Sequence, residues 1–306
     1  MSVASHPSPT RSPALRKRAD GAAAFALAGP ATAAMVALIL LPCLAVVAIA
    51  FTDWTLGAPE IRFVGVENFI TMTTDPTVRA ALFNTALYVA VVTPATLALG
   101  LLVALLIEAG SGMRATYRAI HFIPVMATLA ATAIAWEALL HPTIGLVNLI
   151  LAAMGAPEPN WLRDPQLVLF TLMVLGVWHH VGFAVVLFIA GLNSIPSDLY
   201  DAAAVDGADR TVDRFFTVTL PMLGPVIMFL AILVGLRALQ TFDIVVILTQ
   251  GGPGHASELL LHTLYVESFE FFRTGYGAAL TVVFLLIVAA LTLTQARVFV
   301  RRGHYS

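Results

Sequence analysis

Six long apolar runs constrain the fold of this chain more than any other feature of its sequence. They lie at about 25–51, 82–107, 119–140, 167–192, 222–248 and 277–299. A run of about 20 apolar residues forms a helix long enough to cross a bilayer, and in lipid only helices and closed barrels satisfy every backbone hydrogen bond. Only 11% of the residues are charged, against about 25% in soluble domains. We therefore expect an all-α polytopic membrane protein whose six transmembrane helices form one domain over residues 25–300.

The two ends of the chain are polar. Residues 1–24 are rich in proline and serine and end in a basic cluster, so we expect a disordered tail there and a second, short tail at 301–306. The first apolar run is too long for a cleaved signal peptide, which indicates an uncleaved signal anchor. Cys43 is the single cysteine, so no disulfide can form within the chain. Small residues, as at 95–100, predict close helix packing.

Basic residues are distributed unequally between the loops. The positive-inside rule places the richer set in the cytoplasm, and six spans place both termini on that side. The richer set comprises Arg11, Arg16, Lys17, Arg18, Arg114, Arg118, Arg210, Arg214, Arg297, Arg301 and Arg302, and the opposite loops contain Arg62, Arg79, Arg163 and Arg273. We therefore expect both termini, and the loop between the fourth and fifth runs, to be cytoplasmic.

That loop, residues 198–221, is unusually polar for this chain and contains five aspartates and two arginines. Ser197 is a plausible N-cap, with Asp198 in the first turn of a short helix over 198–206. Gly207 breaks this helix and predicts a corner with positive φ.

A second short helix is predicted over 210–219, with Asp209 as its cap. Val212, Phe215 and Phe216 give this helix an apolar face. A solvated loop is the simpler interpretation of 198–221, but the two helix patterns and the glycine favour a segment that docks on another protein.

The same residues resemble a known family. Asp201-Ala202-Ala203, then three residues, Gly207 and the ending Val218-Thr219-Leu220-Pro221 are similar to the EAA–Gly–I-x-L-P pattern of permease subunits of binding-protein-dependent ATP-binding-cassette (ABC) importers. Asp201 replaces the usual glutamate, and Val218 the usual isoleucine. Further resemblance to the carbohydrate-uptake branch, of the maltose and glycerol-3-phosphate permease type, lies at Asn84-Thr85, 145–148, Trp161-Leu162 and 242–253.

The resemblance implies a type I importer permease fold in a bacterial plasma (inner) membrane, with this chain as the first permease of a pair. It implies four kinds of partner besides the lipid: a second, homologous permease, two cytoplasmic ATPase subunits, an extracytoplasmic solute-binding protein and its solute. It also implies that cytoplasmic coupling helices between the fourth and fifth spans contact the ATPase. The coupling residues carried over are Asp201, Ala202, Ala203, Asp206, Gly207, Phe215, Leu220 and Pro221.

Sequence patterns of enzymes are missing. Lys17 is the single lysine, and no phosphate-binding G-x-x-x-x-G-K-[ST] motif occurs. We therefore expect no catalytic residue and no cofactor in this chain, with ATP and Mg²⁺ bound by the partner ATPase. His255, Glu258 and His262 do not have the spacing of the helical zinc motif, so no metal site is expected. No nucleic-acid partner is expected either.

Ionisable side chains within a span are costly and indicate function by default. Arg237, Gln240 and Asp243 lie in the fifth run. They form a candidate face of the translocation path, or alternatively a structural pair with another helix or subunit. In the fourth run, Trp178, His179 and His180 are suited to binding solute hydroxyl groups, although histidines bonded to a neighbouring helix are the simpler interpretation.

Two functions remain open from the sequence. The first is a permease that imports a sugar or sugar-like solute by alternating access coupled to a separate ATPase. The second is a stand-alone secondary transporter or channel for a small polar solute, which would need an ion-coupling site and usually has internal repeats. The solute could be a sugar, an oligosaccharide, a polyol or a glycerophosphate-like compound.

Overall fold

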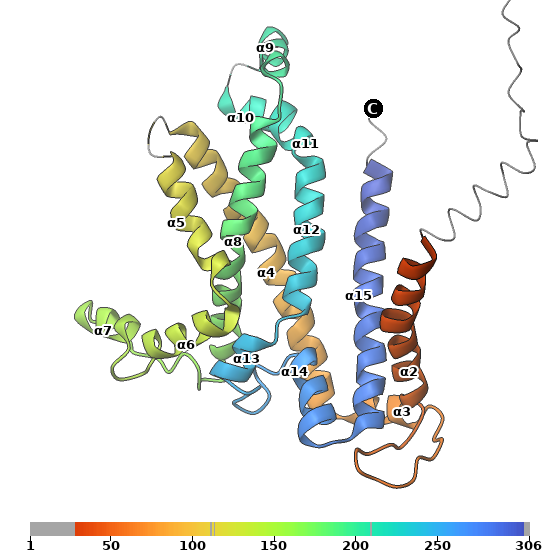
Figure 1. The fold of residues 1–306 in the computed structure, drawn as a ribbon. Coiled ribbons are helices and arrows are strands. Elements are labelled where there is room, and N and C mark those ends of the chain that lie inside the picture. The colour runs from red at the N-terminus through yellow and green to blue at the C-terminus, as the bar shows by residue number, and fades with distance from the viewer. Residues whose placement is uncertain (1–27, 111, 113, 209, 303–306) are drawn as a thin grey trace, which may run out of the picture.

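The computed structural model describes residues 28–110, 112, 114–208 and 210–302, and its helices run side by side in a bundle (Figure 1). Every named element is an α-helix or a short π-helix, and no strand occurs in these ranges. The predicted tail at 1–24 and the cap Asp209 lie outside the described residues. The last helix continues to Arg302, beyond the predicted end of the sixth span at 299.

Long helices form the centre of the bundle. They are Ala28–Ile49, which contains η1 (Val36–Leu40) and α2 (Leu41–Ile49), α4 (Pro76–Ala109), α8 (Val168–Asn193), α12 (Gly224–Leu239) and α15 (Thr274–Arg302). Within the described ranges, five helices are long and apolar enough to cross a membrane, if α12 is joined to α13 (Asp243–Leu248), and six if the bent pair α5 and α6 is one span. The predicted count of six spans stays a prediction.

Short helices connect the long ones. They are α3 (Glu67–Thr74), α7 (Leu146–Ala153), α9 (Ser197–Val205), α10 (Thr211–Arg214), η2 (Phe215–Thr219), α11 (Leu220–Met222), α14 (Leu260–Tyr265) and η3 (Val266–Glu270). Figure 1 places α9, α10 and the C-terminal end of α15 at one end of the bundle, and α3, α13 and α14 at the other.

The third predicted span, 119–140, is not one straight helix. It is divided into α5 (Arg114–Met126) and α6 (Leu129–Leu139), which meet at an angle of 98°. Thr128 is extended and its hydroxyl accepts a hydrogen bond from the Ala131 amide at 3.3 Å, so Thr128 starts a new helix as an N-cap. The fifth run is divided as well, because α12 ends at Leu239 and α13 begins at Asp243.

Close packing between α4 and α8 forms the middle of the fold. A Cβ on Gly100 of α4 would lie 2.7 Å from the Cβ of Ala184 on α8, and a Cβ on Gly176 would meet the Tyr88 hydroxyl at 2.1 Å. Such small residues allow two membrane helices to approach closely. The close packing predicted for 95–100 is therefore confirmed at Gly100.

Two of the resemblance motifs hold loops at the end opposite α9. The side-chain amide of Asn84 donates to the carbonyl oxygens of His255 and Glu258, both at 3.0 Å, and the Thr85 hydroxyl accepts from the Leu260 amide at 2.9 Å. Asn148 accepts from the Trp161 indole at 2.7 Å. These motifs therefore have structural roles, because they satisfy polar groups of long loops at the surface of the bundle.

Candidate functional site

The first half of the polar segment 198–221 is the helix α9 (Figure 1). Asp198 lies in its first turn as predicted, where a carboxylate is favourable beside the free backbone amides. The predicted N-cap is wrong by one residue. Pro196 is the N-cap, and Ser197 is the first helical residue, whose hydroxyl donates to the Asp198 carboxylate at 3.4 Å.

Gly207 ends α9 with φ +92°, as its position in the sequence predicts. Its amide donates to the Ala204 carbonyl at 3.2 Å, and the Ala208 amide donates to the Ala203 carbonyl at 2.9 Å. These two bonds form a Schellman motif, which satisfies the last carbonyls of a helix and needs a residue with positive φ. Among the described residues, no other group lies within 4 Å of the position a Cβ would take at Gly207.

The second half differs from the single helix predicted over 210–219. It consists of α10, the π-helix η2 and the short α11. Pro221 has no amide hydrogen for the Thr217 carbonyl, and its ring clashes with that carbonyl in a regular helix. The wider π turn relieves this conflict, and the Leu220 amide donates to the Phe215 carbonyl across it.

The predicted coupling residues lie on two sides of this segment. Asp201, Ala202, Asp206, Gly207 and Pro221 are exposed, whereas Ala203, Phe215 and Leu220 are partly buried. We call the exposed side of α9, α10 and the start of η2 the docking surface, after the role expected for it from the sequence. Its acidic members are Asp198, Asp201, Asp206 and Asp213. Its apolar members are Leu199, Val205, Val212 and Phe216. Val205 is 88% exposed, an unusual position for an apolar side chain in a folded protein.

Sequence reasoning missed several members of this segment. Val205 and Leu199 were not among the expected contacts, although Val205 directly precedes the capping turn. Three polar residues were missed as well. The Tyr200 and Thr219 hydroxyls are 3.1 Å apart, and the Arg214 guanidinium donates to the Ala208 carbonyl at 3.0 Å. Tyr200 and Thr219 are 19 positions apart, so periodicity along one helix could not reveal their contact.

The side chains of Arg237, Gln240 and Asp243 are all exposed on this chain. Exposure is required if they line the translocation path together, which stays a prediction. Arg237 lies in the last turn of α12, where a cation is favourable, and Asp243 lies in the first turn of α13, where an anion is favourable. The Arg237 guanidinium also lies over the Phe183 ring, 5.6 Å from its centre. In the described part of the chain, neither Arg237 nor Asp243 forms an ion pair.

Trp178, His179 and His180 do not form one group. Trp178 is partly exposed and packs edge-on against Trp136, with ring centres 5.3 Å apart. His179 and His180 are buried, with ring centres 5.2 Å apart, and Nδ1 of His179 has no hydrogen-bond partner among the described residues. Consecutive helical residues point in different directions, so the three side chains do not share one face, and their role in binding solute hydroxyl groups stays a prediction.

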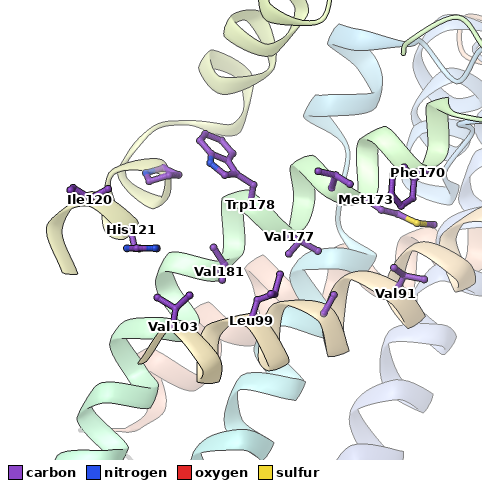
Figure 2. A pocket seen from close by; sticks show the side chains of 13 residues that line it. Val91, Leu99, Val103, Ile120, His121, Phe170, Met173, Val177, Trp178 and Val181 are labelled. Carbon is purple, nitrogen blue, oxygen red and sulfur yellow. The ribbon is translucent and has the colours of Figure 1, made fainter. Parts of the chain in front are cut away.

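A cavity of about 600 Å³ lies between α4, α5 and α8 (Figure 2). Trp178 and Met173 of α8 point into it, as do Val91 and Leu99 of α4. His121 is its one imidazole, and it is hydrogen-bonded to its own helix at the Tyr117 carbonyl, 2.9 Å away. A polar solute needs several hydrogen-bonding groups, and this lining does not supply them.

His262 of α14 forms a structural contact with the loop before this helix. His262 Nδ1 lies 2.7 Å from the Glu258 carboxylate, and both side chains are buried. The same carboxylate oxygen accepts from the Thr263 hydroxyl at 2.8 Å. Over the described ranges, no group of three or more metal-ligating side chains comes together.

Comparison with known proteins identifies the fold and the family. The chain is 32% identical over 281 residues to the sulfoquinovosyl glycerol transport system permease protein of Agrobacterium fabrum, covering 91% of each chain. It is 31% identical over 272 residues to the trehalose/maltose transport system permease protein of Thermococcus litoralis, covering 88% of this chain and 90% of the other.

Among solved structures, the chain matches a bacterial ABC transporter involved in the import of the acidic polysaccharide alginate, with a TM-score of 0.81 at 20% identity, over 94% of this chain and 99% of that one. This match confirms the importer-permease fold. The family model of the binding-protein-dependent transport system inner membrane component matches residues 113–302. The chain therefore belongs to the family of inner-membrane components of binding-protein-dependent transport systems.

Proposed function

We propose that this chain is the permease subunit of an ABC importer that moves a sugar or sugar-like solute from an extracytoplasmic binding protein into the cytoplasm. The observation that supports this proposal best is the docking surface at the tip of α9, where Val205 is 88% exposed beside the Gly207 corner. An apolar side chain so exposed, with aspartates around it, suits burial in a groove of another protein.

The groove belongs to a cytoplasmic ATPase subunit in this proposal. Asp201 and Asp206 border the apolar tip and are exposed, so a groove with an apolar floor and a basic rim complements them. Two such ATPase subunits serve two permeases, this chain and a homologous second one. The eleven basic residues of the richer set support a cytoplasmic position for α9 and both termini.

The solute passes the break between α12 and α13. Gln240 lies in this break and is exposed, and irregular backbone at membrane depth is tolerated only where it lies within protein or lines a water-filled cavity. Arg237, Gln240 and Asp243 offer a cation, an amide and a carboxylate on one face, which suits a solute with many hydroxyl groups. The second permease closes this face into a path.

The class of solute follows from the relatives. The matched permeases are named for sulfoquinovosyl glycerol and for trehalose and maltose, all of which are glycosides or sugars. Transport proceeds by alternating access, because ATP and the loaded binding protein bind the inward-facing and outward-facing states with different affinities. In this proposal, movement of α9 carries the conformational change of the ATPase to the transmembrane spans.

Site-directed cross-linking tests the docking surface. Val205→Cys is placed in a Cys43→Ser chain, because Cys43 is an exposed free cysteine, and is co-expressed with the second permease and the ATPase. A short bifunctional maleimide reagent should join position 205 to the ATPase. Val66→Cys is the matched control, because Val66 is an exposed valine at the opposite end, at the start of α3. Cross-linking at 66 but not at 205 would contradict the proposal.

A further inference from the structure

A closed ring of hydrogen bonds joins the tip of the docking surface to the start of the fifth span. The Thr219 hydroxyl lies 3.1 Å from the Tyr200 hydroxyl and 3.5 Å from the Arg214 carbonyl. A threonine has one hydroxyl hydrogen, so Thr219 donates to Arg214 and accepts from Tyr200. The Arg214 side chain then donates to the Ala208 carbonyl at 3.0 Å, and Ala208 is bonded back to α9 through the Schellman motif.

Burial distinguishes the members of this ring from the docking surface. Thr219 and Val218 are buried, and Tyr200 is partly buried on the inner face of α9. Asp201 and Ala202, the next residues along α9, are exposed. The inner face of α9 is therefore attached to η2, while its outer face stays free for a partner.

The start of α12, which follows η2 and α11, packs against the end of the fourth span. A Cβ on Gly191 of α8 would lie 2.8 Å from the Leu223 side chain and 2.9 Å from that of Val226. Leu223 is fully buried at this contact. Among the described residues, the end of α8, the ring and the start of α12 thus form one contiguous packed unit.

We propose that Tyr200 and Thr219 are positioning residues for coupling, which make α9 and α12 move as one rigid body when the ATPase moves α9. This inference rests on the proposed function, because it assigns the transmission of movement to residues that do not touch the ATPase. Without the Tyr200–Thr219 bond, α9 loses a direct side-chain hydrogen bond to η2, so ATP-driven movement of α9 is partly lost before it reaches α12.

The test measures a distance within the assembled complex and needs no solute. Spin labels at Ser197→Cys and Phe229→Cys, both exposed positions outside the docking surface, report the distance between α9 and α12 in a Cys43→Ser background. In the parent chain, we expect one narrow distance distribution that is the same without nucleotide and after trapping with ATP and vanadate. Tyr200→Phe and Thr219→Val should each broaden this distribution about twofold, because each removes the same hydrogen bond.

Matched variants separate positioning from general stability. Thr219→Ser keeps the hydroxyl and should restore the narrow distribution. Thr217→Val is the control within the same π turn, since Thr217 is exposed and its hydroxyl bonds only its own helix at Asp213. The double variant Tyr200→Phe with Thr219→Val should be no broader than Thr219→Val alone, because Thr219→Val already removes the one bond that the two hydroxyls share.

ATP hydrolysis gives the functional readout. In Tyr200→Phe and Thr219→Val complexes, stimulation by the binding protein should fall about two- to tenfold, the factor expected from losing one hydrogen bond, while basal hydrolysis is unchanged. Unchanged distance distributions and unchanged stimulation in both variants would overturn the inference. If position 205 also failed to cross-link to the ATPase, the proposed function itself would be wrong, so the two failures can be told apart.

Discussion

At the scale of single residues, Asn84 shows how one buried side chain organises a whole loop. Its amide group reaches the carbonyl oxygens of His255, Ala256 and Glu258 at 3.0, 3.3 and 3.0 Å. The amide has two hydrogens, so one of them is shared between two acceptors. Carbonyl groups buried without a partner cost free energy, so Asn84 stabilises the turn before α14.

Asn84→Leu should destabilise the protein. The substitution keeps the volume but leaves the loop carbonyls unsatisfied, at a cost of about 1–3 kcal/mol. Thermal unfolding of the purified complex in detergent should show a lower midpoint temperature. Asn193→Leu is the control, because Asn193 is exposed at the end of α8 and should leave the midpoint unchanged. Equal midpoints for both variants would exclude this role for Asn84.

Arg237→Leu tests the proposed solute path. Arg237 is exposed and forms no ion pair with the described residues of its own chain, so its loss should leave the fold intact. We expect uptake of the transported sugar by proteoliposomes to fall about tenfold or more, the effect of losing a charged hydrogen bond of about 1.5–3 kcal/mol, with basal ATP hydrolysis unchanged. Uptake at the parental rate would remove Arg237 from the path.

At the scale of elements, the turn between α13 and α14 depends on glycine for two different reasons. Gly251 has φ +76°, and a Cβ placed on it would lie 1.8 Å from Glu258 Oε2. Gly254 has φ +55°, and a Cβ placed on it would have no atom of another described residue, apart from its chain neighbours, within 4 Å. A side chain at Gly251 would therefore be strained and would also displace the buried Glu258. A side chain at Gly254 would only be strained.

Gly251→Ala and Gly254→Ala separate these two effects. Gly254→Ala should cost about 1–2 kcal/mol, the penalty of a left-handed conformation for a residue with a Cβ. Gly251→Ala should cost clearly more, because the carboxylate that bonds His262 must move. Thermal unfolding of the two complexes provides the comparison, and a smaller loss for Gly251→Ala than for Gly254→Ala would refute the proposed packing.

The elements also show what the sequence can predict. Apolar runs located the long helices, and the positive φ of Gly207 followed from its place between two helix patterns. The bend after α5 was missed although Thr128 is a good N-cap type, because the apolar composition on both sides favours one continuous span. The Tyr200–Thr219 and Asn84–His255 contacts were missed because each joins residues far apart in sequence, and such pairs are determined by tertiary packing.

At the scale of the whole molecule, the chain has surfaces that need a bilayer and partner chains. The most apolar part of the helix Ala28–Ile49 has no buried residue, and Leu38 and Leu44 on it are largely exposed, so lipid or a second permease must cover this helix. Arg237 and Asp243 are exposed charges, for which lipid contact would be costly. The proposed pair of permeases would cover both kinds of surface.

We propose that residues 198–221 couple this permease to an ATPase. ATP hydrolysis by the reconstituted complex is the direct measure of this coupling. Gly207→Pro is incompatible with φ +92°, and Asp201→Lys reverses an exposed charge of the docking surface. Glu158→Lys reverses an exposed charge between α7 and α8 and serves as the control.

Hydrolysis is measured with and without the loaded binding protein, on complexes shown by gel filtration to contain all subunits. The account predicts that stimulation by the binding protein is lost in Gly207→Pro and Asp201→Lys, while basal hydrolysis persists and Glu158→Lys behaves as the parent. Stimulation that survives both substitutions undiminished would contradict the assignment of this segment as the coupling element.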